Sequence, residues 1–143
     1  MIASVRHVGI VVADLNTALH FYRDMLGLRF VKRTEESGEY IDTMLGTKNA
    51  AIITIKLRAP GDCMIELLHF KTHSHLEKRE IFSQGISHIA LTVRNIDEAH
   101  SRLTAQGAVF NSPPQFSPDG SVKVCVCKDP EGNAIELVQE MKC

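Results

Sequence analysis

The sequence has no long apolar run, no block of like charges and no Cys-x-x-Cys pair, and each absence removes a class of protein. Its apolar runs are far shorter than the roughly 20 residues that a membrane-spanning helix requires. Its N-terminus does not show the pattern of a signal peptide. The net charge of −1 offers no basic excess for binding nucleic acid. We therefore expect a cytoplasmic protein with no membrane and no nucleic-acid partner.

The four cysteines are Cys63, Cys125, Cys127 and Cys143, and we interpret them as reduced thiols. Cys125 and Cys127 would share one face of a strand, where two thiols pack more often than they bind metal. The remaining composition is that of an ordinary globular protein, with 44% hydrophobic and 23% charged residues. A chain of 143 residues fits a single domain with a substantial core.

The chain contains one internal repeat. The stretch "HVGIVVADLNTALHFYRDMLGLRF" from His7 matches "HIALTVRNIDEAHSRLTAQGAVF" from His88, at an offset of 81 that becomes 80 at Gly27 and Gly107. Each copy begins with the period of two that is typical of a strand and then changes to a helical period. The second copy therefore lacks one residue of the helix that we expect in the first.

Helix signals stand at matched places in the two copies. Asp14 and Asn95 are placed as N-caps, and Gly27 and Gly107 as left-handed residues after the last turn. Beyond each helix the pattern predicts strands, with "NSPPQFSPDG" as a loop in the second copy. The predicted strands are 28–35, 39–45, 51–57 and 63–70 in the first copy, and 108–112, 121–127 and 134–139 in the second.

The repeat predicts an α+β fold made of two paired β-α-β-β-β modules. We expect the modules to form a cup-shaped mixed sheet with the helices outside, because two copies are too few for a solenoid. Module 1 covers about residues 5–70, a polar linker covers 71–85 and module 2 covers about 86–140. Together they make a single domain, 1–143.

The two copies also end alike, since "APGDCMIELL" matches "DPEGNAIELV", so Glu66 has a counterpart in Glu136. Side chains alternate faces along a strand, which puts His7 with Glu66 and His88 with Glu136 on the faces away from the helices. A carboxylate in an apolar strand is costly unless something positive meets it. Two imidazoles and two carboxylates suit one divalent ion: zinc, nickel, cobalt, manganese or ferrous iron. The alternative is that core hydrogen bonds satisfy each side chain separately.

The segments "HVGIVVADLNTALHFYRDMLGL" and "DPEGNAIELVQ" resemble the vicinal oxygen chelate superfamily. That superfamily includes glyoxalase I, methylmalonyl-CoA epimerase, extradiol dioxygenases and the fosfomycin and bleomycin resistance proteins. The resemblance covers nearly the whole chain. It implies a cup of two modules around one divalent metal, with His7, Glu66, His88 and Glu136 as ligands and with iron less favoured than zinc, nickel, cobalt or manganese.

The set of two His and two Glu resembles bacterial glyoxalase I. It implies a metal-dependent isomerase or lyase that transfers a proton through a metal-stabilised enediolate on a small oxygenated metabolite. Glu136 is then the first candidate for the catalytic base and Glu66 the second. Glutathione-specific members usually carry an arginine four positions beyond the first ligand, where this chain has Val11. The resemblance therefore leaves the substrate open.

Two alternatives of the same fold remain. A ferrous dioxygenase or an antibiotic-resistance transferase would retain its metal without Glu66, and a non-catalytic protein would bind a drug or metabolite in the cleft. We expect a homodimer, in which each cup closes within one chain or between two. Candidate anchors for a carboxylate or phosphate of a small-molecule substrate are Arg6, Arg33, Arg94 and Lys123.

Overall fold

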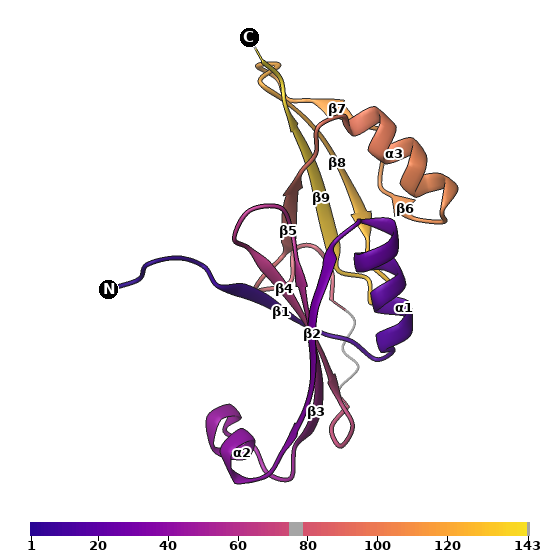
Figure 1. Ribbon diagram of the computed structural model, residues 1–143. Coiled ribbons are helices and arrows are strands. Elements are labelled where there is room, and N and C mark those ends of the chain that lie inside the picture. The colour runs from indigo at the N-terminus through magenta and orange to yellow at the C-terminus, as the bar shows by residue number, and fades with distance from the viewer. Residues whose placement is uncertain (75–78, 143) are drawn as a thin grey trace. The chain divides into compact units, whose positions relative to one another are not determined.

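A computed structural model describes residues 1–74 and 79–142, and the chain divides into two compact units, Met1–Glu77 and Lys78–Cys143. The division falls inside the predicted linker. Each unit contains the strand, helix and three strands that the repeat predicts, so the α+β prediction is confirmed. Figure 1 labels the elements along the chain.

The first unit holds a four-stranded sheet in the order β1-β4-β3-β2. In it β1 runs parallel to β4, and the other pairs are antiparallel. Its strands are β1 (His7–Val11), β2 (Arg29–Ser37), β3 (Ala51–Arg58) and β4 (Met64–Phe70). Its helical segments are α1 (Leu15–Leu19), η1 (His20–Met25) and α2 (Glu39–Leu45).

The second unit repeats this plan with the order β5-β9-β8-β6, and β7 also pairs with β8. The parallel pair is β5 and β9, which corresponds to β1 and β4. Its elements are β5 (His88–Thr92), α3 (Ile96–Ala105), β6 (Val109–Phe110), β7 (Gln115–Phe116), β8 (Val122–Lys128) and β9 (Ala134–Glu140).

One face of each sheet is covered by the first helix of its unit. In the first unit Leu57 and Leu67 are fully buried against this helix layer, which contributes Phe21, Tyr22 and Met25. Burying one such aliphatic side chain contributes about 1.5–3 kcal/mol. The opposite face of each sheet carries the candidate ligands, and we call it the site face.

The helix caps form at the predicted residues. Asp14 accepts a hydrogen bond from the Thr17 backbone N–H at 2.8 Å, and Asn95 accepts one from the Glu98 N–H at 3.1 Å. Gly27 has a φ of 78°, a value that costs a residue with a Cβ considerably more.

The first copy has one residue more than the second, and a π-helix, η1, accommodates it. In η1 the backbone N–H of Leu26 donates to the carbonyl of Phe21, five residues earlier, at 2.9 Å. Such a wide turn absorbs one additional residue without rotating the flanking turns out of register. In the second unit, α3 has no such segment and is α-helical throughout.

The prediction of a strand at 39–45 is wrong, because these residues form α2. Gly38 precedes the helix at a φ of 99° and Gly46 ends it in the left-handed conformation. The carboxylate of Asp42 accepts hydrogen bonds from the backbone N–H groups of Asn49 and Ala50, both at 2.8 Å, which holds the returning chain against the helix.

The segment α2 covers one end of the first unit's site face. Ile41 of α2 packs against Ile52 of β3, and Leu68 and Phe70 of β4 join the same cluster. Ile52 lies opposite Phe70 in the pair of β3 and β4, and Leu68 is two residues beyond Glu66 along β4. The helix therefore closes one end of the face that carries the candidate ligands, between β2 and β3 (Figure 1).

Two further predictions concern the second unit. The loop "NSPPQFSPDG" contains the short strand β7, because Gln115 pairs with Val124 and Phe116 with Lys123. Cys125 and Cys127 are buried and free, as expected, and they pack on the helix side. Cys143 lies outside the described residues.

Among the helices in the described part of the chain, none is long and apolar enough to cross a membrane.

Candidate functional site

The first unit brings His7 and Glu66 together on its site face. In the parallel pair of β1 and β4, Gly9 lies opposite Glu66 and His7 opposite Met64. The His7 Nε2 is 3.8 Å from the Glu66 Oε2, and their side chains are 34% and 13% exposed. A Cβ at Gly9 would come within 3.1 Å of the Leu68 side chain. The Leu68 side chain therefore occupies the space beside this pair that a Cβ at position 9 would need.

The second unit forms the equivalent pair at the equivalent strands. Ala90 lies opposite Glu136 in the pair of β5 and β9. The His88 Nε2 is 3.1 Å from the Glu136 Oε2, with side chains 44% and 25% exposed. On the other side of the ring, the Ser87 Oγ lies 2.7 Å from the His88 Nδ1 and orients the imidazole.

The four predicted ligands therefore occur as two pairs, one in each unit. Within either unit, the described residues bring no third His, Cys, Asp or Glu to the pair to make a larger cluster. In both pairs an imidazole Nε2 and a carboxylate oxygen face each other, so the donors are the nitrogen and oxygen atoms that zinc, nickel, cobalt and manganese accept. The residues present fit a divalent metal in their chemistry.

The environment of the first pair contains one group that the sequence analysis did not select. The Lys56 Nζ is 3.5 Å from the Glu66 Oε2, because Lys56 is the direct cross-strand neighbour of Glu66. A lysine between two buried apolar residues, Ile55 and Leu57, was the available signal. In addition, the His7 Nδ1 is buried and has no hydrogen-bond partner among the described residues.

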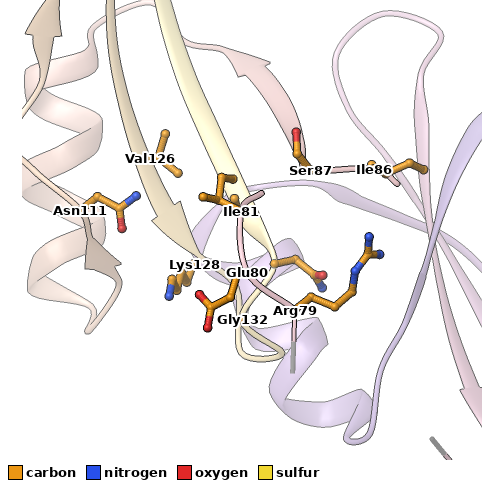
Figure 2. Close-up of a pocket in the computed structure, with 11 residues that line it drawn as sticks. Arg79, Glu80, Ile81, Ile86, Ser87, Asn111, Val126, Lys128 and Gly132 are labelled. Carbon is orange, nitrogen blue, oxygen red and sulfur yellow. The ribbon is translucent and has the colours of Figure 1, made fainter. Parts of the chain in front are cut away.

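The second unit also contains a pocket of about 180 Å³ on its site face. Val126 and Lys128 of β8 line it together with residues 79–81 and 86–87 (Figure 2). Ser87, which contacts the ring of His88, is part of the lining. The pocket therefore adjoins one predicted ligand and offers polar groups to a small molecule.

Of the four predicted substrate anchors, two are engaged elsewhere. The Arg33 guanidinium lies 2.7 Å from the Glu35 carboxylate, on the helix side of the first sheet. The Lys123 ammonium lies 2.7 Å from the Asp97 carboxylate of α3, also away from the site face. Arg6 and Arg94 are exposed.

The fold agrees with the comparison against known families. The family model of the Glyoxalase/Bleomycin resistance protein/Dioxygenase superfamily matches residues 4–137. The chain belongs to this superfamily.

Individual relatives span nearly the whole chain. The chain is 28% identical over 134 residues to a probable lactoylglutathione lyase of Synechocystis, covering 93% of this chain and 92% of the relative. A crystal structure of a glyoxalase family protein from Bacillus cereus matches with a TM-score of 0.88 and 27% identity, over 99% and 97% of the two chains. An antibiotic binding protein of Streptomyces has the same fold, with a TM-score of 0.65, 20% identity and 98% coverage of each chain.

Proposed function

We propose that this protein is a divalent-metal-dependent isomerase or lyase of the glyoxalase and epimerase kind. It would move a proton between neighbouring carbons of a small oxygenated metabolite. The observation that carries the proposal is the repetition of one His–Glu pair at matched strand positions, with Nε2 to carboxylate distances of 3.8 Å and 3.1 Å. The superfamily and the relatives named lactoylglutathione lyase support the same class of chemistry.

In this proposal His7, Glu66, His88 and Glu136 hold one divalent ion. When bound, the ion supplies Lewis-acid stabilisation of the negative charge that develops on the substrate oxygens. Ser87 keeps the His88 ring oriented through its Nδ1, which leaves Nε2 for the ligand role.

The neighbours of the two carboxylates favour Glu136 as the group that moves the proton. Glu66 lies beside Lys56 and is the more buried of the two, with 13% of its side chain exposed. Glu136 has no lysine or arginine within ion-pair distance in the described residues, and 25% of its side chain is exposed. A base needs access to the substrate carbon and freedom to change partner. We therefore assign Glu136 as base and Glu66 as the anchored ligand.

The chain lacks one residue that is usual in glutathione-specific members. Val11 occupies the position where glutathione-specific members usually carry an arginine, and it is exposed on the site face of β1.

We further propose a homodimer that works in the cytoplasm, where the buried thiols of β8 would stay reduced.

The first experiment measures metal content and proton transfer on the same preparations. We expect about one zinc, nickel, cobalt or manganese per chain in the untagged protein, lost in Glu66→Ala and His88→Ala. His20→Ala is the matched control, since His20 is exposed on η1. Assays would follow lactoylglutathione formation and, for other oxygenated substrates, incorporation of solvent deuterium. Glu136→Gln should lower kcat by about 10²–10⁴-fold.

Three results would change the assignment. Iron that persists in Glu66→Ala would favour oxygen chemistry. Metal loss in His20→Ala as well would point to a general effect on folding. Absence of metal after incubation with each ion would contradict the catalytic proposal and leave a protein that binds a metabolite or drug in the same fold.

A further inference from the structure

The site face of the first unit carries a group of cations on β2 and β3. The register pairs Arg29 with Arg58 and Lys32 with Lys56, so two like-charged pairs lie on adjacent rows of the sheet. Lys56 in turn lies opposite Glu66. Like charges directly opposite one another destabilise a sheet unless an anion compensates them.

A β-bulge places Lys32 on this face. The register shifts between Phe30 and Lys32, so that Val31 is the additional residue. With regular alternation, Val31 would lie opposite Lys56 and Lys32 would point to the helix side. Bulges commonly redirect a side chain beside a functional site. Here the bulge brings two lysines next to each other across the strands.

Two neighbouring cations on the helix side share one acidic partner. On the helix side, Arg33 and Lys71 both bind the Glu35 carboxylate at 2.7 Å. On the site face, Lys56 has Glu66 at 3.5 Å. Among the described residues Arg29, Lys32 and Arg58 form no ion pair, and the buried Nε of Arg58 has no hydrogen-bond partner. The other acid on this face of β2 is Glu36, which lies opposite Ile52 near α2.

The second unit serves as an internal comparison. There Val126 lies opposite Glu136 where the first unit has Lys56, and Val109 occupies the position of Arg29. Lys128 corresponds to Arg58. The His–Glu pair is thus common to both units, whereas the group of four cations belongs to the first unit. The second sheet has the same strand order with only one of these basic residues, Lys128, so the fold alone does not account for the other cations.

We propose that Arg29, Lys32, Lys56 and Arg58 bind an oxyanion of the substrate that carries at least two negative charges. A phosphate ester or a dicarboxylate has this chemistry. Lysines act as point charges toward such groups, and arginine donates through a planar fork. Glu66 compensates one of the four cations, so a dianion leaves less unbalanced charge than a monoanion. The inference rests on the proposed function in taking the oxyanion to be part of the substrate.

The experiment is a titration of the full-length protein, as purified, with phosphate, pyrophosphate and succinate, followed by NMR chemical shifts and calorimetry. The test variants are Lys32→Met and Lys56→Val, the latter because Val126 stands at the matched position. Arg33→Met is the control, because it removes the same charge from the helix side of the same strand. We expect saturable binding that weakens about tenfold or more in each test variant, and stays within about twofold of the wild type in the control.

Each outcome bears on the proposal. Tighter binding of phosphate and pyrophosphate assigns a phosphate-bearing substrate, and tighter binding of succinate assigns a dicarboxylate. The proposal is overturned if no anion binds saturably, if both test variants bind as the wild type does, or if Arg33→Met weakens binding equally. Lys32 is exposed on β2, so Lys32→Met decides the matter should Lys56→Val fail to fold. Metal content of the same samples separates this failure from that of the proposed function.

Discussion

The cysteines of the second unit illustrate, at the scale of single residues, how the side of a strand determines side-chain chemistry. Cys125 and Cys127 face the helix side of β8, and burial raises the pKa of each thiol to about 11. The nearby carboxylate of Asp97 also raises the pKa of Cys125. Cys63 precedes β4 and is exposed. The thiolate is the reactive form, so the buried pair is protected twice, by burial and by protonation.

We predict that iodoacetamide at pH 8 modifies Cys63 and leaves Cys125 and Cys127 unmodified. With a pKa of about 11, roughly one thiol in a thousand is ionised at that pH. Peptide mass spectrometry after timed quenching measures each site. In urea all three should react, which is the control. Burial of the neutral thiols also makes the free energy of unfolding depend on pH. Because the folded pKa is raised, their contribution to stability is fully present below about pH 9 and is lost as the pH rises toward 11. Equal native rates at Cys63 and Cys127 would contradict the prediction.

Alternation along strands was sufficient to predict which residues of each unit form a pair. His7 and Glu66 are 59 residues apart in the sequence and become neighbours only through the parallel pairing of β1 with β4. The period of two nevertheless places both side chains on the site face. Lys56 could not be selected in the same way, because any lysine in a strand has the same pattern. Its role depends on the pairing of β3 with β4, which sequence does not specify.

At the scale of elements, α2 and the bulge of β2 show where local pattern is insufficient. A seven-residue segment with apolar residues can be a short helix or a strand. The helix is selected by Asp42, whose carboxylate binds backbone groups at Asn49 and Ala50. The bulge at Val31 is likewise invisible in the alternation of "RFVKR" and depends on pairing with β3. Both features act on the site face.

The π-helix gives a prediction at this scale. Deleting Arg23 should convert η1 into a regular α-helix with the spacing of α3, and the protein should still unfold cooperatively. Arg23 is exposed and pairs with the adjacent Asp24, so little packing is lost. Thermal denaturation followed by circular dichroism measures the effect.

The control is deletion of Ser101 from α3, which has no wide turn to absorb the change. It would rotate the following residues by about 100°, and Leu103, which is 4% exposed, would leave the core. We expect this deletion to cost about 2–5 kcal/mol, as large core truncations do. Equal destabilisation by both deletions would contradict the interpretation of η1 as an inserted residue.

At the scale of the whole molecule, the internal repeat supplies two His–Glu pairs of the same design. Each has one imidazole and one carboxylate within 3.8 Å. Neither unit holds a larger cluster of ligands among its described residues. If the metal takes all four proposed ligands, both units contribute to its site, whether they belong to one chain or to two.

We predict that His7→Ala and His88→Ala each abolish stoichiometric metal binding, because one change lies in each unit. Mixing the two variants under conditions of subunit exchange then tests the homodimer. If each site combines units of different chains, the mixture regains part of the metal, since one site per mixed dimer is intact. If both units of one chain form the site, mixing restores nothing. Mass spectrometry under native conditions measures metal and subunit composition together. Full metal retention by either variant alone would contradict a site that needs both units.

The strand β2 ends the sheet of the first unit, so its outer backbone groups have no neighbour in that sheet. A free edge can accept a strand from another molecule, which is a route to aggregation. Five of the nine residues of β2, "RFVKRTEES", are charged, and its bulge interrupts the regular spacing of backbone donors and acceptors. Both features disfavour the addition of a foreign strand. The same strand that presents Lys32 on the site face thereby limits self-association through this edge when the protein is concentrated.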